Sequence, residues 1–125
     1  MNPITEVFAV VAALIHVFFF YLESVTFTRP ATWRRFFVGS QADAELLRPM
    51  AFNQGFYNLF LAIGAIGGVI AANVGYVEAG RALVLLACGS MAAAGVVLMA
   101  SDRRFVRSGL IQAGPPLIAL AGLFL

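Results

Sequence analysis

Two ionisable side chains, His16 and Glu23, lie in one long apolar run near the start of the chain, the stretch VFAVVAALIHVFFFYLE from Val7 to Glu23. Imidazole and carboxyl groups are the usual general acids and bases of enzymes. Seven residues separate them, close to two helical turns, so a helix projects both from nearly one face. Ionisable groups at membrane depth are costly and generally face a partner or a cavity. We therefore take His16 and Glu23 as a candidate catalytic pair.

A second group of polar residues opens a later apolar run, where three amides and a phenol fall within six residues: Asn53, Gln54, Tyr57 and Asn58. Residues four apart are neighbours on a helix, so these side chains form one broad polar face. Gln112 adds an amide to the last apolar run. Such groups orient a polar substrate group or stabilise an oxyanion. We predict that they bind substrate together with Trp33, which would cover it.

Acid–base chemistry fits these residues better than metal chemistry. The backbones of His16 and Glu23 are about two turns apart, too far for one shared metal ion. One histidine and one cysteine supply no zinc or iron ligand set. The sequence therefore predicts no metal site, and no cofactor motif is visible. The competing interpretation is a satisfied buried polar network that only fixes how the helices pack.

The composition is that of a membrane protein. Of 125 residues, 62% are hydrophobic and 11% are charged, whereas soluble domains average about 45–50% apolar and about 25% charged residues. The length supports one domain, residues 1–125. The N-terminus lacks the basic region and cleavage site of a signal peptide, so we expect its apolar run to stay as an anchor. The lone Cys88 excludes cysteine-pair redox chemistry.

The apolar pattern predicts an all-α integral membrane four-helix bundle. A spanning helix needs about 20 residues, with a range of about 17–25. Three apolar segments fit this length, and a fourth is marginal because its purely apolar part is short and Pro115 and Pro116 interrupt it. Their expected bounds are about Ile4–Val25, about Met50–Ala72, Ala82–Ala100 and about Val106–Leu125.

The arginines predict how the chain is oriented. All eight basic residues are arginine, and seven lie between segments one and two or between segments three and four, while only Arg81 lies on the other side. Basic short loops stay cytoplasmic. We expect both termini on the non-cytoplasmic side of a bacterial inner membrane, and His16, Glu23 and the amides in the cytoplasmic half. No basic patch interleaved with aromatic residues indicates nucleic-acid binding.

The only long loop, Thr26–Pro49, combines aromatic residues with arginines from Thr32 to Phe37. This composition suits a short helical segment lying in the membrane interface. Ser40-Gln41-Ala42-Asp43 resembles the start of a further short helix through Leu47, and Pro49 fits the first turn of the second span. The loop is either a connector or a lid over the cytoplasmic mouth of the bundle.

Glycines on the second span allow close helix contact. Gly64 and Gly68 form a GxxxG motif, a pattern that lets two membrane helices approach closely. Packing within the bundle is one use of this face, and a homodimer is the other.

With these residues in place, the chain resembles the small bacterial membrane proteins called domain of unknown function 1304. The resemblance rests on His16, Glu23, Trp33, the block from Asn53 to Ala62 and the stretch from Gln112 to Pro115. It covers nearly the whole chain and implies four membrane helices. It implies no activity.

Three functions stay open at this point. The first is binding of, or proton-transfer chemistry on, a lipophilic small molecule such as an isoprenoid, a sterol or a quinone. The second is a small proton-coupled transporter, although transporter sites usually lie at the midplane and Glu23 lies near a helix end. The third is an accessory subunit of a membrane complex. A lipid-accessible pocket beside His16 and Glu23 would favour the first.

Overall fold

The computed structural model describes residues 1–125, and the chain is all-helical, as expected. Its long helices are α1 (Pro3–Phe20), α3 (Gln41–Asn73), α4 (Val77–Ser101) and α5 (Val106–Gly122). Three shorter elements, α2 (Pro30–Trp33), η2 (Arg34–Phe36) and η3 (Arg103–Phe105), occupy the connections between them. A π-helical turn, η1 (Tyr21–Val25), continues α1.

Three of these helices are long and apolar enough to cross a membrane: Pro3–Val25, Gln41–Asn73 and Val77–Ser101. They include the first three expected spans. The fourth expected span forms α5, which has 17 residues and lies at the lower limit of spanning length. Pro115 and Pro116 are inside α5 and do not end it.

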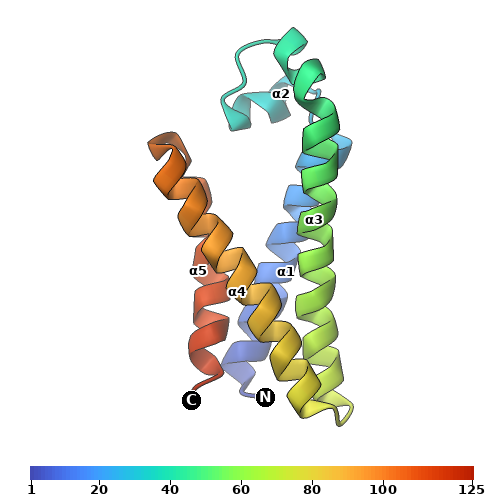
Figure 1. The fold of residues 1–125 in the computed structure, drawn as a ribbon, viewed down its shortest axis with the longest axis vertical. Helices are drawn as coiled ribbons and strands as arrows, with labels where there is room; N and C mark the ends of the chain where they lie inside the picture. The colour runs from blue at the N-terminus through green and yellow to red at the C-terminus, as the bar shows by residue number, and fades with distance from the viewer.

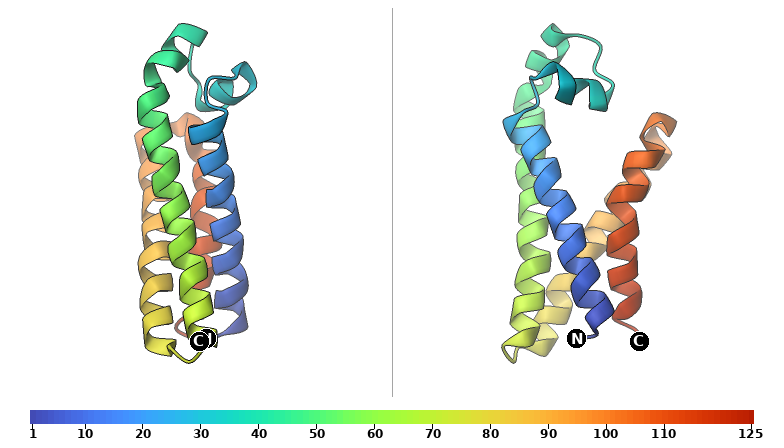
Figure 2. Two further views of the ribbon diagram at one scale, coloured as in Figure 1. Left: turned by 90° about the vertical axis from the view of Figure 1, so that its right-hand side faces the viewer. Right: turned by 180° about the vertical axis from the view of Figure 1, so that it is seen from behind.

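The four long helices form two pairs that diverge, as Figure 1 shows. Helix α1 packs along α3, and α4 packs along α5. Contacts of α3 with α4 and of α1 with α5 join the two pairs near the end that carries both chain termini, here called the narrow end (Figure 2). At the opposite, wide end the pairs separate, and α2 and η2 lie beside the start of α3.

Small side chains build the core of the narrow end. Ala9, Ala13, Ala65 and Ala119 are fully buried there, with Val84, Cys88 and Met91 from α4. The Thr5 hydroxyl donates a 3.0 Å hydrogen bond to the Ala119 carbonyl and ties the start of α1 to α5. In lipid, close approach of helices depends on such small residues and on hydrogen bonds between helices.

Gly68 packs inside the chain. A β-carbon at Gly68 would lie 2.8 Å from Val84 Cγ2 and 2.9 Å from the Gly80 carbonyl oxygen, both on α4. Gly64 also faces α4, where its β-carbon would lie 3.5 Å from that of Ala87. The GxxxG face is therefore used between α3 and α4.

The prediction of a separate short helix before the second span was wrong. Ser40 is the N-cap of α3, and its hydroxyl accepts a hydrogen bond from the Asp43 amide, as the sequence indicated. The helix then continues through Pro49 to Asn73 without a break. Proline removes one helical hydrogen bond and frees the carbonyl four residues earlier. Both Pro49 and Glu45 are exposed, so water can solvate that carbonyl.

Candidate ligand-binding cavity

The π-helical turn η1 positions Glu23 at the end of α1. Single π-helical turns within α-helices occur frequently at functional sites. Here the Ser24 hydroxyl donates a 2.8 Å hydrogen bond to the Phe52 carbonyl of α3. Gly55 is the contact point on α3, since a β-carbon there would clash with the Ser24 side chain. The absence of a side chain at Gly55 thus lets η1 lie directly against α3.

This close contact brings Glu23 to Asn58. The Asn58 amide donates a 2.6 Å hydrogen bond to Glu23 Oε1, and Asn58 is only 7% exposed. No cation neutralises this carboxyl group, because the only salt bridge in the chain joins Arg104 and Asp102. Glu23 is therefore held by one amide and is otherwise free to interact with a ligand.

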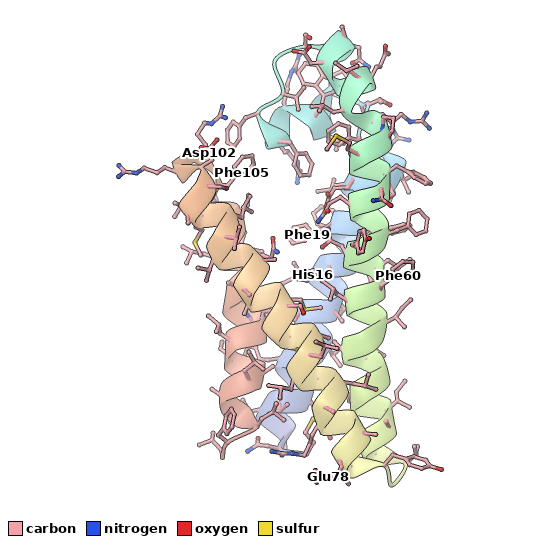
Figure 3. All side chains as sticks on the ribbon, viewed as in Figure 1. His16, Phe19, Phe60, Glu78, Asp102 and Phe105 are labelled. Atoms are coloured by element: carbon pink, nitrogen blue, oxygen red, sulfur yellow. The ribbon has the colours of Figure 1, made fainter.

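Glu23 and Asn58 both face a cavity of about 750 Å³ between the two helix pairs. It is lined by 17 residues, 11 of them hydrophobic. Helix α1 and its continuation η1 contribute a stripe with helical spacing, here called the α1 stripe, in which every residue before Glu23 is apolar: Val11, Leu14, Ile15, Phe18, Phe19 and Leu22. The opposite wall comes from α4 and α5 through Ala94, Leu98 and Ile111. The cavity occupies the space between the diverging arms in Figure 3, where Phe19 and Phe105 are labelled on opposite sides.

Polar groups reach the cavity from three elements besides η1. They are Arg35 from η2, Gln54 and Asn58 from α3, and Ser108 and Gln112 from the first two turns of α5. The stripe from Val11 to Leu22 carries none. The cavity thus offers hydrogen-bonding groups together with a long apolar wall, which suits an amphiphilic molecule better than a wholly polar one.

The structure does not bring His16 into this group. His16 is fully buried, and its Nδ1 lies 2.8 Å from the Ala12 carbonyl oxygen of its own helix. A carbonyl oxygen only accepts, so Nδ1 carries the hydrogen. Nε2 has no hydrogen-bond partner, and the ring packs edge-on against Phe19 at 5.3 Å. His16 is absent from the cavity lining and lies near the point where the helix pairs meet (Figure 3).

Three of the residues expected to bind substrate lie outside the cavity lining. Trp33 is buried in a separate small cluster with Phe27 and Ala44, and its indole donates a 2.8 Å hydrogen bond to Gln41 Oε1. Asn53 and Tyr57 are exposed, Tyr57 to 59%. One residue is a turn of about 100° on a helix, so Gln54 and Asn58 face the cavity while Asn53 and Tyr57 face outward.

The sequence did not indicate three residues of this site. Two of them line the cavity, Arg35 and Ser108, and the third, Ser24, holds η1 against α3. Helical periodicity carries no information on Arg35, because it lies in a connection. Ser24 follows Glu23 directly, and only the π-helical turn reveals that it reaches α3. The signal for Ser108 was its spacing from Gln112, one helical turn, which places both on one face.

Above the cavity, the two connections of the wide end touch. Phe37, which has a left-handed backbone conformation with φ of 58°, packs edge-on against Phe105 at 5.1 Å and lies under the Arg104 guanidinium at 5.0 Å. Arg104 also pairs with Asp102 at 2.8 Å. Hydrogen bonding to Arg104 lowers the pKa of the Asp102 carboxyl group below its ordinary range.

No group of three or more His, Cys, Asp or Glu side chains lies close enough together to hold a metal ion. Cys88 is a free thiol buried in the apolar core.

These features define the class of protein: an all-helical chain, able to cross a membrane with three of its helices, with an amphiphilic cavity between two helix pairs. The chain belongs to the family described as protein of unknown function (DUF1304), whose model matches residues 10–124. The resemblance noted from the sequence is therefore confirmed. No curated protein and no solved structure matches the chain.

Proposed function

We propose that the protein is a multi-pass membrane protein that binds a lipophilic molecule within the bilayer, using the cavity beside Glu23 and Asn58. The observation that carries the proposal is an apolar cavity of about 750 Å³ with a carboxyl–amide pair in its wall. Ligand pockets in proteins typically measure about 300–1,000 Å³ and combine apolar walls with few polar groups.

The placement in the membrane follows from the arginines. Seven of the eight lie in the connection between η1 and α3, in the first turns of α3, in η3 and in the first turn of α5, all at the wide end. Basic loops stay on the cytoplasmic side. In our proposal α1, α3, α4 and α5 cross a bacterial inner membrane as a four-helix bundle, α2 and η2 lie in the cytoplasmic interface, and both termini face outward.

Access from the bilayer supports a lipophilic ligand. Leu14 is 59% exposed although it lines the cavity, and Phe18 and Ile111 on either side of the gap are also exposed. Such side chains would face lipid tails, so the cavity would open sideways between α1 and α5. A lipophilic molecule could enter this way without passing through water.

Glu23 is the group best placed for proton transfer on such a ligand. It lines the cavity, and Asn58 fixes one of its carboxyl oxygens. His16 contributes by fixing the packing of α1, since its Nδ1 bonds within its own helix and its ring is buried. Acid–base chemistry in this protein would therefore use one carboxyl group, with Gln54 and Gln112 orienting the ligand.

The packing of the narrow end favours binding over transport. A transporter needs a path from its site to the other side of the membrane, and here fully buried alanines of α1, α3 and α5 fill that half. The accessory-subunit alternative predicts that a cellular phenotype survives Glu23→Gln. The binding proposal predicts that the phenotype is lost.

Photocrosslinking tests the proposal directly. The probe is a long-chain alcohol carrying a diazirine, added to the purified protein in phosphatidylcholine nanodiscs, with adducts mapped by mass spectrometry. We expect saturable adducts on Leu14, Phe18 and Ile111. Ala94→Trp would fill the cavity and abolish them, whereas Leu86→Trp, on the outer surface of α4, would not.

Glu23→Gln tests the role of the carboxyl group. Hydrogen bonds to charged groups contribute about 1.5–3 kcal/mol, so we expect this variant to weaken probe binding by roughly tenfold. Glu78→Gln is the matched control, because Glu78 is exposed at the narrow end, far from this cavity. Unsaturable labelling, spread evenly over all lipid-facing residues, would overturn the proposal.

A further inference from the structure

Arg35 is the only basic residue that lines the cavity. Its guanidinium has five N–H donors, yet it makes no hydrogen bond or salt bridge with any other residue of the chain. It comes from η2, beside Phe36, which also lines the cavity. Arg35 is exposed, so its donors lie at the rim of the cavity, where no acceptor of the protein engages them.

Other arginines of the chain have partners of their own or lie away from the cavity. Arg81 donates a 3.0 Å hydrogen bond to the Leu123 carbonyl. Arg104 is paired with Asp102, and Arg34 lies over the Trp33 ring at 5.4 Å. Arg103 and the remaining arginines are exposed, as Arg35 is, but they lie outside the cavity lining. Arg35 thus combines a cavity position with unused donors.

Glu23, the acidic group of the cavity, differs from Arg35 because it has a hydrogen-bond partner within the protein. Glu23 already accepts a short hydrogen bond from Asn58, so a protein donor partly satisfies it. Arg35 has no corresponding acceptor. Arg35 is therefore a cation at the cavity rim with no partner in the protein, and a planar guanidinium binds carboxylate and phosphate groups through two parallel hydrogen bonds.

We propose that the ligand is an amphiphile with an oxyanion head group, a carboxylate or a phosphate monoester, bound by Arg35, and with one apolar chain lying along the α1 stripe. This inference rests on the proposed function and names its ligand class. From Val11 to Glu23 the stripe extends over twelve residues of helix, about 18 Å. A cavity of about 750 Å³ suits one such chain better than the two chains of a bilayer phospholipid.

In this arrangement the head group lies in the interface and the chain lies at membrane depth. Charged groups are stable at the interface and costly in the hydrocarbon layer. Glu23 and Asn58 would then face the part of the ligand next to its head group. Proton transfer by Glu23 would act there.

The experiment compares diazirine probes that share one chain and differ only in the head group: a carboxylate, a phosphate monoester and a primary alcohol. Each is titrated at pH 8 into the protein in phosphatidylcholine nanodiscs. We expect one of the anionic probes to bind roughly tenfold more tightly than the alcohol, as a charge-assisted hydrogen-bond pair implies. The tighter of the two identifies the head group.

Arg35→Gln assigns the preference to this residue. It should bring the preferred anionic probe to the affinity of the alcohol and leave the alcohol unchanged. Arg103→Gln, which removes an exposed arginine at the same end, should leave every probe unchanged. Equal binding of all three probes to the wild-type protein, or a preference that survives Arg35→Gln, overturns the inference while the proposed function stands.

Two further outcomes separate the remaining possibilities. Absence of saturable binding by every probe overturns the proposed function itself. If an anionic probe does bind, Ala94→Trp tests where it binds. Loss of binding supports the cavity, whereas a retained Arg35-dependent preference shows that Arg35 binds lipid head groups at the membrane surface and overturns the inference.

Discussion

The narrow and wide ends of the molecule are built from the same four helices, yet one is closed and the other is hollow. Within each helix pair the contact is close over the whole length: Gly55 lets η1 touch α3, and Gly95 and Gly109 bring α4 and α5 together. Between the pairs, comparable contacts exist only at the narrow end, where Gly68 meets Gly80 and Thr5 meets Gly122. The cavity therefore begins at the level where the two pairs no longer touch through small residues.

The largest loss of stability is expected from adding a side chain at Gly80, where the backbones of α3 and α4 lie closest together at the narrow end. A β-carbon at Gly80 would lie 2.5 Å from the Gly68 carbonyl oxygen and 2.7 Å from the Ala72 nitrogen. Gly80→Val should therefore lower the free energy of unfolding by about 3 kcal/mol, the upper part of the range for overpacked sites. Denaturation of the protein in mixed micelles, followed by circular dichroism, measures this change.

Gly67→Val is the matched control for that prediction. Gly67 is on α3 beside Gly68, but a β-carbon there would have no neighbour within 4 Å. The control should leave the free energy of unfolding nearly unchanged. Equal losses in the two variants would mean that close contact between α3 and α4 does not hold the narrow end together.

A smaller effect on stability, but a large one on binding, is expected from Gly55→Ala. The new methyl group would collide with the Ser24 side chain and push η1 away from α3, at a cost of about 1–2 kcal/mol in the free energy of unfolding. Because Glu23 is part of η1, its hydrogen bond to Asn58 would break and probe binding would weaken. Gly64→Ala, with an ordinary 3.5 Å contact, is the control and should preserve both.

The all-helical class and the positions of the long helices were largely predictable, because a helix that can cross a membrane requires a long apolar run. The all-α class and the approximate bounds of the long helices followed from runs of about 20 apolar residues. Pro49 misled the prediction, since proline suggests a helix start and the exposed helix tolerates it within α3. The divergence of the two helix pairs depends on which small residues face each other, and one sequence does not reveal such pairings.

The candidate site was predictable only in part. Glu23, Gln54, Asn58 and Gln112 all line the cavity, because polar residues in apolar helices usually face the protein interior. The separation of Gln54 from Asn53, adjacent in sequence, depends on the rotation of α3. His16 and Glu23 share a helix face in a regular helix, but the π-helical turn alters the spacing between them, so periodicity overestimated their proximity.

His16→Leu tests whether a residue buried beside the cavity, but outside its lining, contributes to binding. The ring is buried, and its only hydrogen bond is to a carbonyl of its own helix, while Nε2 has no partner. In the helix the Ala12 carbonyl also accepts from the His16 backbone amide, so removing the imidazole leaves no acceptor unpaired, and we expect the free energy of unfolding to change by no more than about 1 kcal/mol. Probe binding should persist, and a loss as large as that of Glu23→Gln would place His16 in the functional site.

The smallest effect is expected at the exposed connection over the wide end. The Asp102–Arg104 pair lies next to Phe37 and Phe105, where the two connections touch. Its hydrogen bonds lower the pKa of the Asp102 carboxyl group. The stabilisation is therefore complete above the ordinary pKa of aspartate and is lost as the pH falls through the lowered value.

A carbon-detected NMR titration of Asp102 measures that shift. In the wild-type protein the midpoint should fall below the ordinary aspartate range, and in Arg104→Gln it should rise toward that range. High salt should reduce the difference, because exposed ion pairs are screened by counterions. Arg107→Gln is the control, since Arg107 forms no ion pair with Asp102 and does not contribute to its lowered pKa. A midpoint that is the same in wild type and Arg104→Gln would show that the two connections touch without this ion pair.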